Sequence, residues 1–105
     1  MDQVRASHIL LMYAGSERST ASRTKAEALA GIEGFKSQLA EGAEFAGIAV
    51  ANSDCPSAAQ GGDLGAFGRG QMVSEFEEAA FSMEIGEVSG VIETDFGYHL
   101  VKRTG

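Results

Sequence analysis

The segment Gly61-Gly-Asp-Leu-Gly-Ala-Phe-Gly-Arg-Gly-Gln-Met72 is too rich in glycine to form a long helix or strand, because glycine loses more backbone freedom on folding than any other residue. Within it, residues 64–67 predict a short strand, and the glycines on either side predict tight turns. It is not a phosphate-binding loop, since it lacks both the G-x-x-x-x-G-K-S/T pattern and the glycine spacing of a dinucleotide fingerprint. The long elements must therefore lie on either side of it.

After this segment, the sequence predicts one helix and two strands. Ser74 and Glu77 have the spacing of a capping box, in which a hydroxyl and a carboxylate bind the free amides at a helix start. Residues 88–93 and 98–103 are strand-like, and Thr94-Asp-Phe-Gly97 between them is typical of a hairpin turn. The apolar face of the expected helix consists of Phe76, Ala79, Ala80 and Met83.

Before this segment, the sequence predicts a strand, a loop and a long helix. Residues 4–13 are rich in apolar and β-forming residues, which indicates a strand. Residues 13–23 are mostly small and polar without a period, which indicates a loop. Thr24 and Glu27 form a second capping box and should start a helix that ends at Gly42. Its apolar residues recur at helical spacing, namely Leu29, Ile32, Phe35 and Leu39.

A shorter helix is expected over residues 44–51 and a loop over residues 52–62. The predicted order of elements is therefore β-α-α-β-α-β-β. Three helices must then cover a small, four-stranded, mostly antiparallel sheet, which is an α+β fold. Because no repeat or linker interrupts the chain, we expect residues 1–105 to form a single domain.

Composition narrows the class of protein. The 105 residues are 44% hydrophobic, which is enough for one core, and they include no transmembrane-length apolar run and no signal-peptide pattern at the start. A single cysteine excludes an internal disulfide and favours a cytoplasmic location. The net charge of −7 disfavours a nucleic-acid partner. The acidic stretch 75–95 predicts a helix and a loop whose acidic faces are solvated. The alternative interpretation is an acidic flank that repels anionic partners.

Two histidines and one cysteine are the candidates for chemistry. His8 and His99 fall in expected strands from opposite chain ends, and pairing of those strands would bring both imidazoles together beside Cys55. The residues alone leave several interpretations open. A zinc site that adds Asp54 lacks the local ligand spacings of such sites. A Cys–His nucleophile lacks an oxyanion motif and places Cys55 in a polar loop rather than at a helix N-terminus.

Taken together, several motifs resemble the parvulin family of peptidyl-prolyl cis/trans isomerases. The resemblance covers essentially the whole chain in order, and its most specific parts are the glycine-rich segment and the terminal Gly-x-His. It implies four antiparallel strands with helices packed on them. The motifs are His8-Ile-Leu10, Asn52-Ser-Asp-Cys55, Gly62 to Met72, Phe76-Glu-Glu-Ala-Ala-Phe81, Gly86-Glu-Val-Ser-Gly90 and Thr94-Asp-Phe-Gly-Tyr-His99.

The resemblance also implies a catalytic site. His8 and His99 match paired histidines that form a hydrogen-bonded dyad beneath the substrate. Cys55 matches the residue beside the X–Pro bond, and Thr94 matches a hydroxyl that supports the dyad. The implied pocket for the substrate proline consists of Leu64, Met72 and Phe76, with Phe67 packing behind or beside it and with Val73 and Phe96 on its rim.

The implied substrates are proline-containing polypeptides, with no metal, no cofactor, no nucleic acid and no membrane involved, and a monomer is expected. One branch of the family recognises phospho-Ser/Thr before proline through a lysine and an arginine pair. Here Met12 stands in place of the lysine, and the pair reads Glu17-Arg18. Arg18 and Arg23 remain as possible anion contacts, but Glu17 would oppose a dianionic phosphate. We therefore predict weak or no phosphate selectivity.

Two alternatives to an isomerase remain from the sequence. A non-catalytic peptide-binding or chaperone module of the same fold would bind extended polypeptide, although the intact set of His8, Cys55, His99, Met72 and Phe76 favours catalysis. A redox-responsive protein would use oxidation of Cys55, but the sequence offers no resolving cysteine.

Overall fold

The structure is a computed structural model that describes residues 3–16, 19, 21–72 and 74–105. The order of its elements confirms the predicted α+β fold and adds one short 3₁₀ helix. No helix in these ranges has the length and apolarity needed to cross a membrane. In chain order the elements are β1 (Gln3–Leu11), α1 (Lys25–Ala40), α2 (Phe45–Asn52), the 3₁₀ helix η1 (Pro56–Gln60), β2 (Asp63–Gly68), α3 (Ser74–Ser82), β3 (Ile92–Thr94) and β4 (Gly97–Arg103).

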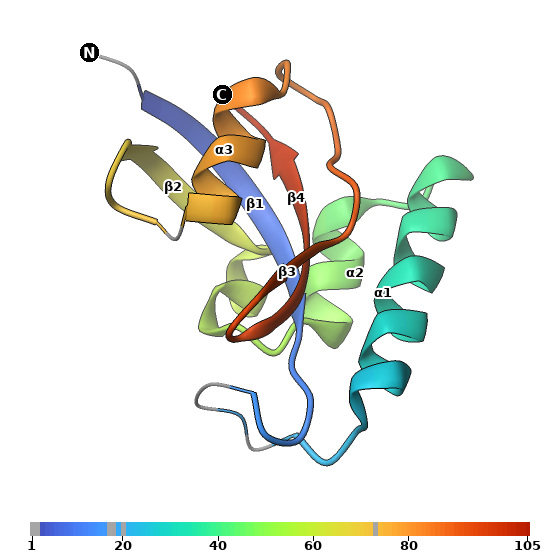
Figure 1. The fold of residues 1–105 in the computed structure, drawn as a ribbon. Helices are drawn as coiled ribbons and strands as arrows, with labels where there is room; N and C mark the ends of the chain where they lie inside the picture. Colours follow the sequence, from blue (N-terminus) through green and yellow to red (C-terminus); the bar gives the residue numbers. More distant parts are fainter. Residues whose placement is uncertain (1–2, 17–18, 20, 73) are drawn as a thin grey trace.

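Strands from the two ends of the chain form the centre of the sheet. The strand order is β2-β1-β4-β3, and all neighbours are antiparallel. Figure 1 shows β1 and β4 running side by side through the middle of the molecule. In their register Leu10 lies opposite His99 and His8 lies opposite Val101. The two histidines are therefore diagonal neighbours on one face, within reach of each other's rings.

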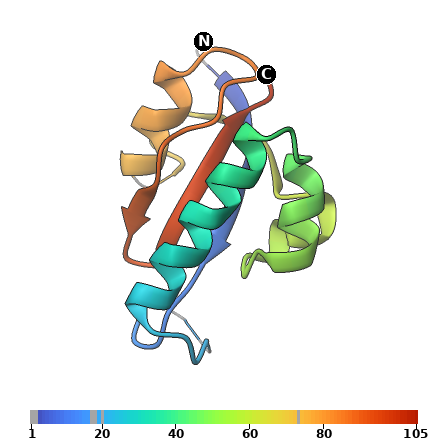
Figure 2. The ribbon, with the colours of Figure 1, turned by 90° about the vertical axis from the view of Figure 1, so that its right-hand side faces the viewer.

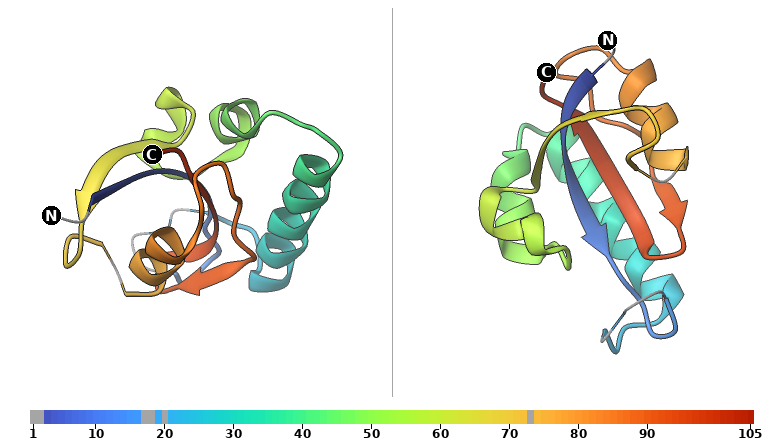
Figure 3. Two further views of the ribbon diagram at one scale, coloured as in Figure 1. Left: turned by 90° about the horizontal axis from the view of Figure 1, so that it is seen from above. Right: turned by 90° about the vertical axis from the view of Figure 1, so that its left-hand side faces the viewer.

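Helices cover both faces of this sheet. α1 and α2 pack against the face that carries Ile9 and Leu100, both fully buried. α3 packs against the opposite face, where its Phe76 joins a cluster that includes Val101. Figures 2 and 3 show α1 lying along one side of the central strands and α3 on the other. The histidines lie on the α3 side, so their surroundings are set by α3 and by the loops at that face.

The two predicted capping boxes have different outcomes. At α1 the box is confirmed, because Glu27 N donates to Thr24 Oγ1 at 3.1 Å and Thr24 N donates to the Glu27 carboxylate at 2.8 Å. At α3 the prediction is wrong: Ser74 is already the first helical residue, and the Glu77 carboxylate accepts from Gly70 N instead. The Glu77 carboxylate therefore binds a backbone amide of the loop between β2 and α3 rather than the amide at the start of its own helix.

Two further segments differ from prediction. The expected loop 52–62 contains η1, and Cys55 is the N-cap of this short helix rather than part of a plain loop. The expected strand 88–93 is reduced to β3 and an isolated bridge between Val88 and Lys102. The hairpin is confirmed: Thr94 pairs with Gly97 across a two-residue turn.

Gly62 fixes how closely the segment after η1 approaches β1. Its φ is +84°, and its carbonyl accepts a hydrogen bond from His8 N at 3.0 Å. A Cβ at this position would lie 2.3 Å from the His8 carbonyl oxygen. Both the positive φ and the close approach therefore require glycine.

We expect Gly62→Ala to lower the free energy of unfolding by clearly more than Gly65→Ala, as measured by urea denaturation. Both glycines have positive φ, +84° and +74°, so both variants pay roughly 1–2 kcal/mol for a left-handed backbone. Gly65 has open space around its missing Cβ, whereas Gly62 faces the backbone of His8. Equal losses in the two variants would contradict the packing role of Gly62.

Candidate active site

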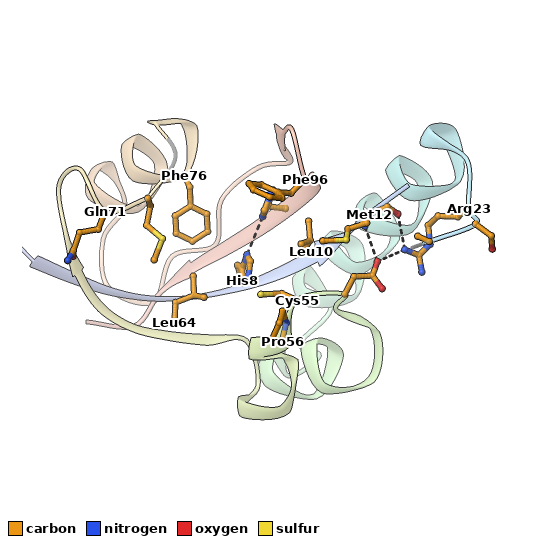
Figure 4. Close-up of a pocket in the computed structure, with 15 residues that line it drawn as sticks. His8, Leu10, Met12, Arg23, Cys55, Pro56, Leu64, Gln71, Phe76 and Phe96 are labelled. Atoms are coloured by element: carbon orange, nitrogen blue, oxygen red, sulfur yellow. Dashed lines mark hydrogen bonds and ion pairs between the residues drawn. The ribbon is translucent and has the colours of Figure 1, made fainter. Parts of the chain in front are cut away.

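A cavity of about 850 Å³ opens on the α3 side of the sheet, around the two histidines. This volume is in the upper part of the range typical of small-molecule sites, so the cavity is larger than one proline ring requires. It is bordered by β1, the loop before α1, the start of η1, β2, the segment before α3, and the β3–β4 hairpin. Figure 4 shows its lining side chains converging from these elements.

The histidines form the polar floor of the cavity. His8 Nδ1 and His99 Nδ1 are 3.2 Å apart, and the two rings are stacked with 5.3 Å between centroids. Both side chains are buried, at 6% and 4% exposure. The Phe76 ring is nearly perpendicular to both imidazoles, with its centroid 5.6 Å from that of His8 and 6.2 Å from that of His99. The structure therefore brings together the pair that the sequence places at opposite ends of the chain.

Thr94 adds a third polar side chain, from a third strand, to the two histidines. Its Oγ1 is 2.7 Å from His99 Nε2 and accepts a hydrogen bond from Phe96 N at 3.2 Å. Thr94 is buried at 5% exposure. The row Thr94–His99–His8 thus crosses β3, β4 and β1, and it ends at His8 Nε2. That buried nitrogen has no hydrogen-bond partner among the described residues.

Both imidazoles are neutral at physiological pH. Burial lowers the pKa of His8 to about 4. Burial, together with the neighbouring His8, lowers the pKa of His99 to about 4. Because both Nδ1 atoms face each other, one must donate and the other accept. In one arrangement His99 Nδ1 donates to His8 Nδ1. The Thr94 hydroxyl then donates to His99 Nε2, and His8 Nε2 carries a proton. In the opposite arrangement His8 Nδ1 donates, and His8 Nε2 is an acceptor.

One end of the cavity is apolar, and three of the expected pocket residues line it. These are Leu64 from β2, Met72 from the following loop and Phe76 from α3. Phe67 does not line the cavity: it is 2% exposed and packs behind Phe76, with 5.8 Å between ring centroids. Val73 lies outside the described residues.

Cys55 and Phe96 border the cavity on the other side of the histidines. Figure 4 shows the Cys55 sulfur directed into the cavity. Phe96 lies at the tip of the β3–β4 hairpin and is half-buried, as expected for a rim residue. Pro56, the first residue of η1, extends this wall and did not enter the prediction. The sequence could have indicated Pro56 as a site residue, because it is the chain's one proline and directly follows Cys55.

Arg23 reaches the cavity, but its charge is already paired. Its guanidinium donates to the Asp54 carboxylate and, at 2.9 Å, to the carbonyl of Met12. Asp54 also accepts from Met12 N at 2.9 Å. Sequence reasoning considered Asp54 as a metal ligand and missed this ion pair, which depends on the loop folding back. Arg18 lies outside the described residues.

Other lining residues were missed because no local pattern marks them. Leu10 and Gln71 line the cavity, one as part of its buried floor on β1 and the other at its mouth. The zinc interpretation gains no support, since the described residues contain no group of three His, Cys, Asp or Glu side chains arranged to hold a metal. Apart from the ion-paired Arg23 and Asp54, the residues that line the site are neutral polar or apolar.

Comparison with known proteins decides the family. The model for the PPIC-type PPIase domain matches residues 1–105. The chain belongs to the parvulin family of peptidyl-prolyl cis-trans isomerases. The peptidyl-prolyl cis-trans isomerase Pin1 of Digitalis lanata is 41% identical to this parvulin over 115 residues, covering 99% of this chain and 98% of the relative.

Solved structures agree with this membership. The peptidyl-prolyl isomerase ESS1 from Candida albicans superposes with a TM-score of 0.91 at 40% identity, over 98% of this parvulin and 63% of that chain. The parvulin NmPin of Nitrosopumilus maritimus gives a TM-score of 0.69 at 40% identity, over 100% and 98% of the two chains. The activity of this parvulin is therefore the isomerisation of peptidyl-prolyl bonds.

Acid should destabilise this parvulin before its carboxylates titrate. In the unfolded chain each imidazole has a pKa near 6.5, whereas both folded-state values are about 4. Below pH 6.5 the unfolded state therefore binds protons that the folded state excludes. We expect the free energy of unfolding to fall by about 3 kcal/mol between pH 6.5 and 5, about half of it from each histidine, measured by urea denaturation.

The control for this measurement is His8→Leu, which removes one of the two titrating groups and should give a shallower loss over the same interval. A free energy of unfolding that stays constant in the parent protein from pH 6.5 to 5 would contradict a neutral, buried pair.

Proposed function

We propose that the cavity around His8 and His99 is the site at which this parvulin rotates X–Pro bonds. In this proposal the proline ring lies against Leu64, Met72 and Phe76, and the rotating amide lies over the histidines beside Cys55. The observation that carries it is that one cavity combines an apolar end with a floor of buried, hydrogen-bonded imidazoles. Phe67 supports the pocket from behind Phe76.

The physical task suits such a site. Rotation about the X–Pro bond meets a barrier of about 20 kcal/mol, because the nitrogen lone pair is delocalised into the carbonyl. Water stabilises the charge-separated planar amide, so an apolar cavity that removes water destabilises this ground state. A site complementary to the twisted amide lowers the barrier further. No bond breaks, and the proposed mechanism uses neither cofactor nor metal.

In this proposal His8 Nε2, which lacks a hydrogen-bond partner among the described residues, is the atom of the histidine pair left to bind the substrate amide. It is buried, it belongs to a cavity-lining residue, and it has no partner among the described residues. When Thr94 donates to His99, the proton order places a hydrogen on His8 Nε2, ready to bind the amide as it twists. When the order reverses, the same atom accepts. Thr94 and His99 therefore act as positioning residues for His8.

Cys55 serves this mechanism as a polar wall, not as a nucleophile. We expect Cys55→Asp to keep a substantial part of kcat/KM, on the order of a tenth or more of the parent value, because a small polar group still faces the amide. A protease-coupled isomerisation assay measures it, with Cys55→Ala as the control that removes the polar group. Loss of activity to background in Cys55→Asp would indicate a covalent role.

We also propose that this parvulin has little phosphate selectivity. Arg23 is paired with Asp54, and Lys25 pairs with Glu93 at 2.8 Å, so each of these cations already has an anionic partner. A phosphate at the cavity would have to displace a carboxylate from Arg23 and approach Asp54 itself. Both costs disfavour a dianion.

The test is a comparison of kcat/KM for peptides that carry phospho-Ser, Glu or Ala before proline. We expect turnover of the Ala-Pro peptide, and values for the phospho-Ser-Pro and Glu-Pro peptides that are no higher. No turnover of any peptide would contradict the assignment of the site. A hundredfold preference for the phosphopeptide would contradict only the lack of phosphate selectivity.

Finally, we propose that residues 1–105 work as one catalytic domain, as a monomer in the cytoplasm, on polypeptides rather than nucleic acid or membrane. The net charge of −7 supports the exclusion of anionic partners, and the single cysteine supports a reducing compartment. The alternative of a non-catalytic chaperone would accelerate no refolding at catalytic concentrations.

A further inference from the structure

Met72 reaches the cavity from a loop whose backbone is free to move unless other contacts hold it. The loop begins at Gly68, the last residue of β2, and Gly70 follows with a φ of +87°. A Cβ at Gly70 would have no described atom within 4 Å, so this residue lies in open space rather than in a packed core. Met72, two residues further on, nevertheless lines the apolar end of the cavity. Its position therefore depends on how the preceding loop residues are attached.

Glu77, in the first turn of α3, attaches two of these residues. Its Oε1 accepts a hydrogen bond from Gly70 N, and its Oε2 lies 3.7 Å from the guanidinium of Arg69. The Glu77 side chain is only 18% exposed, so this charge-assisted hydrogen bond is shielded from much of the solvent. One carboxylate thus connects two consecutive loop residues to the helix.

Phe81 provides a second attachment point on α3, one helical turn further along. The Arg69 guanidinium lies over the Phe81 ring, 4.3 Å from its centroid, which is the geometry of a cation–π interaction. Glu77 and Phe81 are four residues apart and are therefore neighbours on the helix surface. Phe81 packs edge-on against the buried Phe67, with 6.2 Å between ring centroids. Through Arg69 the loop is therefore attached to the hydrophobic core.

Gln71 makes the loop a compact unit. Its Oε1 accepts a hydrogen bond from Gly68 N at 2.6 Å, which closes residues 68–71 into a turn. Figure 4 shows Gln71 on the same side of His8 as Phe76, where the proposed proline pocket lies. Because the turn is closed, contacts that hold its middle also fix Met72, the next residue of the chain.

We propose that Glu77 is a positioning residue for the isomerisation: together with Arg69 it anchors the loop 68–72 to α3 and thereby holds Met72 against the substrate proline. This inference rests on the function proposed above, in which the ring lies between Met72 and its neighbours in the pocket. Glu77 is not among the described residues that line the cavity, so it acts through Met72 and not on the substrate.

The physics of the reaction predicts which kinetic constant this anchor controls. The proline ring keeps its shape while the preceding carbonyl rotates, so Met72 contacts the ring equally well in the planar and in the twisted amide. An interaction that is equally strong in both states lowers KM and leaves kcat unchanged. Release of the loop should therefore raise KM alone. If Glu77 only stabilised the fold, its loss would reduce the amount of folded enzyme and leave KM unchanged.

The experiment measures kcat and KM for an Ala-Pro peptide in a protease-coupled assay. We expect Glu77→Ala to raise KM by about fivefold or more, with kcat within about twofold of the parent value. Glu77→Gln still offers an acceptor to Gly70 N and should keep KM within about twofold of the parent value. Glu78→Ala is the matched control and should change neither constant, because Glu78 is exposed on the same helix and is not among the described cavity-lining residues.

A double variant tests whether Glu77 acts through Met72. Met72→Ala alone should raise KM by about tenfold. Adding Glu77→Ala should change this value by less than about twofold, because two residues that act through one contact do not have additive effects. If urea denaturation shows Glu77→Ala to be unfolded, Arg69→Ala replaces it in both measurements. The Arg69 side chain is 60% exposed, so its removal leaves the core intact, and KM should rise by about threefold or more.

The outcomes separate the anchor from the site itself. A parent-like KM in the anchor variant, or a fall in kcat alone, overturns the positioning role and leaves the proposed function intact. A double variant whose KM reflects the product of the two single effects overturns the route through Met72. A parent-like KM in Met72→Ala overturns the placement of the proline ring, and no turnover by the parent protein overturns the proposed function.

Discussion

The antiparallel pairing of β1 with β4 is the interaction on which the rest of the structure depends. It joins the two ends of the chain at the centre of the sheet, and its register places His8 and His99 diagonally on one face. A slip of one residue in either strand would turn that strand's histidine to the face covered by α1 and α2. The register is specified because both faces are buried, each against its own helices.

The polar row exists because three strands present one side chain each to the same buried face. Thr94, His99 and His8 satisfy one another, except at His8 Nε2, which has no hydrogen-bond partner among the described residues. Burial keeps the imidazoles neutral. It also makes their hydrogen bond important for stability, because an unpaired polar group in buried surroundings raises the free energy of the folded state. The same burial that tunes the site therefore makes the fold sensitive to acid.

Much of the fold followed from local patterns that carry a physical mechanism. The capping box at Thr24 and the hairpin turn that ends at Gly97 were predictable, because hydroxyl, carboxylate and glycine act within a few residues of their own position. The same reasoning failed at Ser74, because the Glu77 carboxylate accepts a hydrogen bond from Gly70 N in the loop before the helix. It also missed η1.

The sequence by itself determined the α+β class, the family resemblance and the identity of the rare polar side chains, since these depend on residue type, order and short spacing. Only the tertiary structure decided how those side chains are used. The 3.2 Å contact of the two imidazoles and the pairing of Arg23 with Asp54 join segments that are distant in the chain. Such contacts arise from strand register and loop closure, which are properties of the packed chain and not of any local pattern.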